Sequence, residues 1–198
     1  MKNFKLIALA LTLVFATACK DNNKESEDNM ETEMETEVKE MMTDENEITK
    51  ELTFNLSPKS DSNVEGTVTF TQTGDEVSMV ANMSGLTEGT HAIHIHEKAD
   101  CSSADAKSTG GHWNPTAQPH GKWGDEAGYH KGDIGNFEVG TDGKGMVEFS
   151  TDQWCMGCGD DTKDIIGKAI IVHQGTDDFT SQPSGDAGSR VSCGGIIE

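Results

Sequence analysis

The sequence predicts an all-β domain, an antiparallel sandwich or barrel, from three observations. Short segments in which apolar and polar residues alternate recur throughout residues 48–198. Glycine is abundant, with 22 in the chain, and turn residues separate these segments at regular intervals. No stretch of this region shows the apolar periodicity of an amphipathic helix. Short strands with frequent turns and no helices are typical of sandwiches and barrels.

The first element in the chain is a predicted signal peptide over residues 1–18. Lys2 and Lys5 give it a basic start, and the apolar run over residues 6–15 is too short for a comfortable membrane span. Small residues lead directly to Cys19, which resembles a bacterial lipoprotein box and implies that Cys19 is lipidated. An ordinary signal peptide or an uncleaved anchor is the alternative. We therefore expect an exported protein of the cell envelope or periplasm, held at a membrane by an N-terminal lipid.

Residues 19–47 are predicted to be the lipidated cysteine and a disordered acidic tether. From Lys20 to Glu47 there are 12 acidic residues against three lysines, and no aromatic residue. Such a segment stays solvated because it cannot bury enough apolar surface. Residues 48–198 then form one folded domain. The net charge of −20 argues against nucleic acid as a partner.

Strand candidates within the domain are residues 52–56, 64–70, 77–83, 90–97, 132–139, 145–149 and 168–173. The second and third should form a hairpin around Gly74, because alternate residues in each are apolar and share a face. These residues are Val64, Gly66, Val68 and Phe70 in one strand, and Val77, Met79, Ala81 and Met83 in the other. Residues 98–131 and 175–190 lack periodicity, and loops of this length are usually functional.

Six of the seven histidines, together with one aspartate, occur in a spacing that can hold two metal ions. On the strand at residues 90–97, side chains alternate between faces, so two histidines share one face while His91 points to the other. Imidazole nitrogens together with one carboxylate are typical ligands of copper and zinc. We expect His91 to be a hydrogen-bonded structural residue. The ligand candidates are His94, His96, His112, His120, Asp133, His130 and His173.

This order of ligands resembles the copper/zinc superoxide dismutase family over most of residues 48–198. The resemblance implies a Greek-key β-sandwich or flattened barrel that converts superoxide to O2 and hydrogen peroxide, using one copper and one zinc ion per chain. It assigns His94, His96, His112 and His173 to copper, and His112, His120, His130 and Asp133 to zinc. His112 would then bridge the two ions and supply a proton during catalysis.

Further roles follow from the same resemblance. Asp177 would accept hydrogen bonds from His94 and His120 and so orient both rings. Arg190 would position the superoxide anion, for which a permanently charged guanidinium with several donors is suited. Cys101 and Cys193 would form the intrachain disulfide of the family.

Cys155 and Cys158 depart from the family pattern. Three interpretations are open for this CxxC pair: a local loop disulfide, an auxiliary copper site, or a redox-active pair. A redox-active CxxC normally opens a helix that lowers the thiol pKa, and the sequence predicts no helix there.

Two other functions fit parts of the sequence. The domain could be a metal buffer of the cell envelope that binds copper or zinc without turnover. It could also be a structural or adhesion sandwich whose histidines stabilise loops through zinc. The complete ligand set and Arg190 favour the enzyme, which would protect the envelope from oxidative damage. Monomer and homodimer are both compatible with the sequence.

Overall fold

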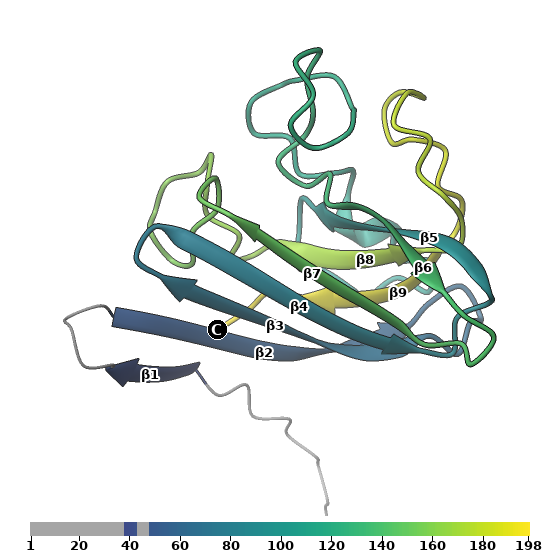
Figure 1. The fold of residues 1–198 in the computed structure, drawn as a ribbon, viewed down its shortest axis with the longest axis horizontal. Coiled ribbons are helices and arrows are strands. Elements are labelled where there is room, and N and C mark those ends of the chain that lie inside the picture. The colour runs from purple at the N-terminus through teal and green to yellow at the C-terminus, as the bar shows by residue number, and fades with distance from the viewer. Residues whose placement is uncertain (1–37, 43–47) are drawn as a thin grey trace, which may run out of the picture. The chain divides into compact units, whose positions relative to one another are not determined.

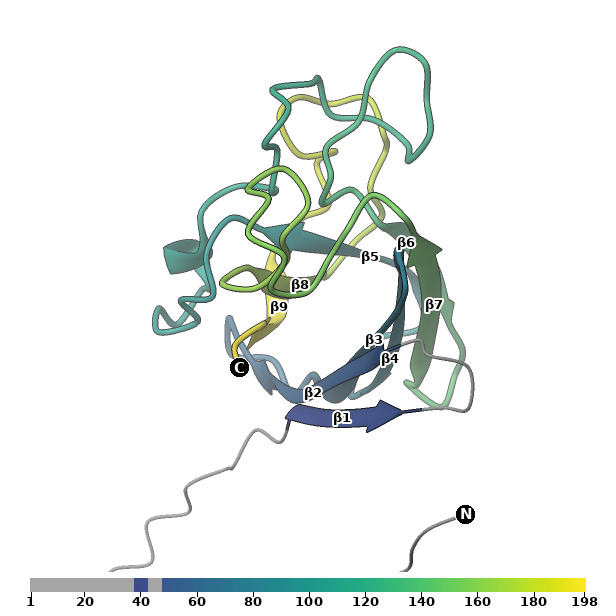
Figure 2. The ribbon, with the colours of Figure 1, turned by 90° about the vertical axis from the view of Figure 1, so that its left-hand side faces the viewer.

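A strongly curved antiparallel sheet dominates the computed structural model, which describes residues 38–42 and 48–198. Within these residues nine strands form one sheet, and eight of them curl into a nearly closed barrel (Figures 1 and 2). The strands are β1 (Val38–Met42), β2 (Ile48–Pro58), β3 (Glu65–Thr73), β4 (Glu76–Ser84), β5 (Gly89–His96), β6 (Gly135–Val139), β7 (Gly145–Thr151), β8 (Ala169–His173) and β9 (Arg190–Gly195). The all-β prediction is therefore confirmed.

Connections between distant strands give the barrel its Greek-key character. Across the sheet the order is β6-β5-β8-β9-β2-β3-β4-β7, and β1 pairs with β2 beside this path. All the pairings are antiparallel. β4 thus lies beside β7, and β5 beside β8, although long stretches of chain separate each pair. The two end strands of the path, β6 and β7, are consecutive in sequence, so the connection between them brings the open edges of the barrel together.

The hairpin predicted around Gly74 is formed by β3 and β4. Thr73 pairs with Glu76, and Gly74 turns the chain with a φ of +58°, which glycine adopts readily. The apolar residues of each strand face the barrel interior as predicted. Val68 and Phe70 of β3 are fully buried, as are three of the four predicted residues of β4. This alternation lets one face of each strand fill the core while the other meets solvent.

β5 differs from the hairpin because both of its faces are buried. Ile93 and Ile95 are fully buried and belong to the main apolar cluster of the barrel. His94 and His96 alternate with them and project to the opposite face. That face is covered by the two long connections, residues 97–134 and 174–189, which Figure 1 shows standing above the barrel. The strand therefore separates an apolar core from a polar site.

Three elements differ from the sequence prediction. The strand expected at residues 132–139 begins at Gly135, because Gly132 pairs with the backbones of Ile95 and Trp113 in the long loop. β9 was not predicted, because Gly194 and Gly195 interrupt the apolar alternation that marks a strand. Its position in the sheet depends on pairing with β8, which is a contact between distant parts of the chain.

β1, the third of these elements, lies inside the segment predicted to be a tether. Residues 1–37 and 43–47 lie outside the described residues, and with them the predicted signal peptide, Cys19 and most of the tether. In the described part of the chain, no helix is long and apolar enough to cross a bilayer.

Candidate metal centre

The candidate ligands converge into two adjoining groups on the face of β5 that is turned away from the core. In each group, one possible ligand atom from every residue lies within 4.8 Å of the others. His112 belongs to both groups. The first group is His94, His96, His112 and His173, and the second is His112, His120, His130 and Asp133. All seven side chains are buried, with at most 5% of any residue exposed.

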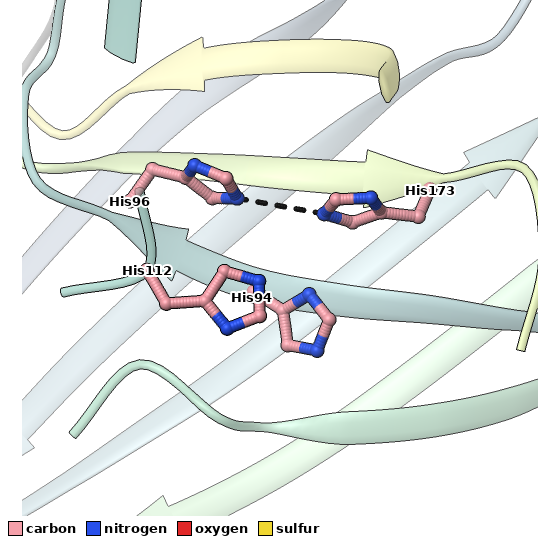
Figure 3. A group of neighbouring side chains, drawn as sticks. All are labelled: His94, His96, His112 and His173. Carbon is pink, nitrogen blue, oxygen red and sulfur yellow. Dashed lines mark hydrogen bonds between the residues drawn. The ribbon is translucent and has the colours of Figure 1, made fainter. Parts of the chain in front are cut away.

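Strands supply most of the first group. His94 and His96 come from β5, and His173 ends β8, which pairs with β5 in antiparallel register. A bulge follows Val172 and breaks the regular register of β8 and β9 at His173. His112 arrives from the long loop, which crosses β5 through an isolated bridge between His96 and His112. Figure 3 shows the four rings turned toward a common space.

His94 and His112 each hold a buried ring nitrogen that has no hydrogen-bond partner. These atoms are Nδ1 of His94 and Nε2 of His112, and the two ring centroids lie 4.0 Å apart. The opposite nitrogens are engaged: His94 Nε2 lies 2.8 Å from Asp177 Oδ2, and His112 Nδ1 lies 2.8 Å from Asp133 Oδ1. A buried polar atom without a partner is costly, so two such atoms side by side indicate a place for a cation.

His96 and His173 complete this group from the other side. Backbone carbonyls hold their outer nitrogens, Gly110 O at 3.0 Å from His96 Nδ1 and Gly188 O at 3.5 Å from His173 Nδ1. Their Nε2 atoms face each other 3.4 Å apart (Figure 3). Four imidazole nitrogens are thus presented to one point, a donor set that suits Cu(II).

The second group is arranged around the carboxylate of Asp133. The Nδ1 atoms of His112, His120 and His130 lie 2.8, 2.9 and 3.2 Å from its oxygens. Nδ1 of His120 and Nδ1 of His130 make no hydrogen bond despite these short distances. Three imidazole nitrogens and one carboxylate oxygen within 4.8 Å of one another are the donor set of a tetrahedral zinc site. Both groups therefore fit the metals that the resemblance assigns to them.

Burial and charge set the protonation of these groups in the protein chain alone. Burial, followed by the neighbouring His94, lowers the pKa of His112 to about 4, which keeps its ring neutral at pH 7. Burial also opposes protonation of His120, but contacts with Asp133 and Asp177 outweigh it and raise that pKa to about 9. Because a metal binds an imidazole nitrogen that carries no proton, a cation at Nδ1 of His120 would compete with a proton there.

Asp177 joins the two groups through the nitrogens that point away from the candidate metals. Its Oδ2 lies 2.8 Å from His94 Nε2, and its Oδ1 lies 2.9 Å from His120 Nε2. The backbone N–H of Phe179 donates to the same Oδ1 at 2.7 Å. Gly185 adopts a φ of +68°, and a Cβ atom there would overlap Oδ1 of Asp177. The carboxylate can therefore orient both rings only because residue 185 has no side chain.

A pocket of about 570 Å³ opens onto the first group and is lined by His96, His112 and His173. Arg190, the first residue of β9, also lines it and is paired with His173 in the sheet. Its Nη1 donates to Ala106 O at 2.8 Å and to Thr109 Oγ1 at 3.1 Å, which fixes the guanidinium at the pocket wall. A fixed cation beside buried ligands can bind a small anion.

Lys107 also lines the pocket and was not among the site residues predicted from the sequence. It begins the short 3-10 helix η1 (Lys107–Thr109) and lies 2.9 Å from the carboxylate of Asp105. The only available signal was its position in a long loop between candidate ligands.

Two disulfides are present in the described residues. Cys101 of the long loop is bonded to Cys193 of β9, as the resemblance implies. Cys155 is bonded to Cys158, which is the local loop disulfide among the three interpretations of this pair. The seventh histidine, His91, belongs to neither ligand group. Its Nδ1 lies 2.9 Å from His173 O and its Nε2 lies 2.8 Å from Thr87 O.

Comparisons with known proteins agree with this geometry. The sequence model of the family "Copper/zinc superoxide dismutase (SODC)" matches residues 64–196. "Extracellular superoxide dismutase [Cu-Zn]" of Caenorhabditis elegans is 36% identical over an alignment of 137 residues that covers 66% of this chain and 60% of that protein. The chain therefore spans 60% of the length of this relative.

Solved structures of a SOD-like protein from Bacillus subtilis also resemble the chain. One, of a double mutant, has a TM-score of 0.66 and 32% identity, covering 74% of this chain and 97% of that one. Another, of the protein without those substitutions, has a TM-score of 0.65 and 31% identity, covering 73% and 97%.

Proposed function

Because this chain belongs to the copper/zinc superoxide dismutase family, we propose that it is an exported enzyme that converts superoxide to O2 and hydrogen peroxide. The observation that carries the proposal is the sharing of His112 between two buried ligand groups. One ring presents one nitrogen to each group, so two cations could be bridged through it. A shared histidine is not required for metal storage or for a structural zinc site, but it is required where one ring couples a redox metal to proton transfer.

We propose that His94, His96, His112 and His173 hold copper, and that His112, His120, His130 and Asp133 hold zinc. The unpartnered nitrogens of His94, His112, His120 and His130 support this assignment. When bound, copper supplies one-electron redox chemistry, and zinc supplies fixed positive charge beside the bridging ring. Asp177 positions the two rings that it contacts, one in each group.

The chain's own residues bind the substrate and manage protons. Dismutation consumes two superoxide anions and two protons and releases one O2 and one H2O2. Arg190 binds the anion at the pocket wall, where its guanidinium is already held by Ala106 and Thr109. His112 lines the same pocket, and its Nε2 would pass a proton to the reduced substrate.

Three single substitutions test the shared ligand. His112→Ala should lower the content of both metals, His130→Ala should lower zinc alone, and His173→Ala should lower copper alone. Metal content by mass spectrometry and superoxide turnover are measured on the same samples. Wild-type protein that binds both metals without turnover would identify a buffer, and zinc alone would identify a structural site. If His112→Ala behaved like His130→Ala, the shared-ligand assignment would be wrong.

We further propose that the protein acts at the cell envelope and protects it from superoxide. The basic and apolar start of the sequence, the small residues before Cys19 and the acidic residues that follow support a lipid-anchored domain on a tether. The relative from Caenorhabditis elegans is named an extracellular enzyme, and two disulfides are compatible with an oxidising compartment. Cys19→Ala should move the protein from the membrane fraction to the soluble fraction. Unchanged membrane association of this variant would contradict the anchor.

A further inference from the structure

A second cluster of metal-ligating side chains lies outside the candidate copper and zinc centre. Cys155, Cys158 and Asp164 belong to the connection between β7 and β8, and their ligand atoms lie within 4.8 Å of one another. We propose that these three residues form a separate Zn(II) site once the Cys155–Cys158 disulfide is reduced. This proposal does not rest on the proposed superoxide chemistry, because the cluster contains none of the residues assigned there.

The donor set is suited to zinc. Two cysteines separated by two residues are a common zinc-binding spacing, and a carboxylate oxygen is an accepted third ligand. Cu(I) prefers soft sulfur ligands to a hard carboxylate oxygen, so the carboxylate favours zinc. A solvent molecule can fill the fourth position of the tetrahedron, since Cys158 is exposed in the loop.

Asp164 is held in place by the loop that carries the cysteines. Its Oδ1 accepts hydrogen bonds from the backbone N–H groups of Gly157 and Ile166 at 3.0 and 3.1 Å. Its Oδ2 accepts one from Gly159 at 3.0 Å. Gly157 and Gly159 flank Cys158, so the carboxylate is tied to both sides of that residue. The third ligand therefore stays beside the thiol whether or not the sulfur atoms are bonded.

Cys155 is also positioned independently of its disulfide. Its backbone N–H donates to Lys163 O at 2.9 Å, and its carbonyl accepts from the N–H of Ile165 at 3.0 Å. The next residue, Met156, donates its N–H to Gln72 Oε1 at 2.7 Å. These contacts reach β3 and the far side of the loop. Opening the S–S bond would leave the loop largely preformed, which reduces the entropic cost of binding an ion.

The two disulfides differ in their access to a reductant. Cys158 is exposed, whereas Cys101 is half-buried and Cys193 is 1% exposed within β9. A dithiol reductant would therefore reach Cys158 first. The reductant gives two electrons and two protons to the S–S bond and becomes a disulfide itself. Zinc binding then releases the two thiol protons to solvent.

The experiment begins with full-length protein that carries copper and zinc at the histidine sites. A trialkylphosphine reduces the accessible disulfide and is itself oxidised to the phosphine oxide, with water supplying the oxygen and the two protons of the new thiols. After reduction, the wild-type protein should contain two more free thiols per chain than the double variant Cys155→Ser/Cys158→Ser. That variant keeps Cys19 and the Cys101–Cys193 pair. Zn(II) is then titrated, and Co(II) serves as a spectroscopic probe of thiolate ligation.

We expect reduced wild-type protein to bind one more zinc ion per chain than the double serine variant, and Co(II) to give thiolate charge-transfer absorption only in the wild type. Asp164→Asn should weaken this binding by at least about tenfold. Unreduced protein should not bind the extra ion. Equal zinc binding by the wild type and the double variant would overturn the proposal, as would Asp164→Asn with unchanged affinity. A site that took Cu(I) but not Zn(II) would also contradict it.

Discussion

Replacing Arg190 by alanine should slow superoxide turnover without removing either metal. The Arg190 guanidinium donates hydrogen bonds to Ala106 O and Thr109 Oγ1 at the pocket wall. Two of its donor directions are used to hold the guanidinium, and the others remain available to an anion in the pocket. The substitution therefore removes a binding group and leaves both ligand groups in place.

The size of the effect follows from the kind of contact that is lost. A hydrogen bond to a charged group contributes about 1.5–3 kcal/mol. The lower end applies because the Arg190 side chain is only half-buried, so solvent screens part of its charge. About 1.5 kcal/mol corresponds to a loss of roughly tenfold in kcat/KM. Arg190→Lys keeps the charge but loses the planar fork, so its loss should be smaller.

The assay is kcat/KM for superoxide, measured by rapid mixing across a range of ionic strength. Lys144→Ala is the matched control, since this exposed lysine lies in the turn between β6 and β7 and is not among the pocket residues. It removes the same unit of charge from elsewhere. Copper and zinc contents of all variants should equal those of the wild type. If Arg190→Ala and Lys144→Ala have equal kcat/KM values, Arg190 does not bind the substrate anion.

Three other outcomes are expected. Asp177→Ala should lower the affinity for both copper and zinc by about 10–100-fold, measured by chelator competition, because one ring of each ligand group loses its partner. Asp178→Ala, at the exposed neighbouring residue, should leave both affinities unchanged. In protein stripped of metal, burial would raise the pKa values of Asp133 and Asp177, but their histidine contacts outweigh it and hold both below the unfolded value of about 3.9. The free energy of unfolding, measured in urea, should therefore include a contribution that is present above about pH 4 and is lost as the pH falls below it. A free energy of unfolding that did not change with pH would argue against these contacts. Replacing Cys101 and Cys193 by serine should lower the free energy of unfolding by about 2–4 kcal/mol, more than loss of the other disulfide, whose cysteines are three residues apart.

Much of the scaffold could be predicted because it depends on local periodicity. The alternation in β3 and β4 and the turn at Gly74 specify a hairpin without reference to the rest of the chain. β9 could not be found this way, since its pairing with β8 is made across a long loop and its own apolar pattern is interrupted by Gly194. The start of β6 was misplaced for a related reason, because contacts with Trp113 draw Gly132 into the loop.

The sequence by itself determined which residues can bind metal and in what order they occur, because ligand chemistry belongs to the residue type and strand alternation places His94 and His96 on one face. Tertiary structure decided which ring nitrogens of His94, His112, His120 and His130 are left without a hydrogen-bond partner. It brought Asp177 to His94 and His120 across 83 and 57 residues, and it divided the two nitrogens of His112 between two groups. Such contacts depend on how long loops close over the barrel, and loop paths are fixed by distant partners that no local pattern contains.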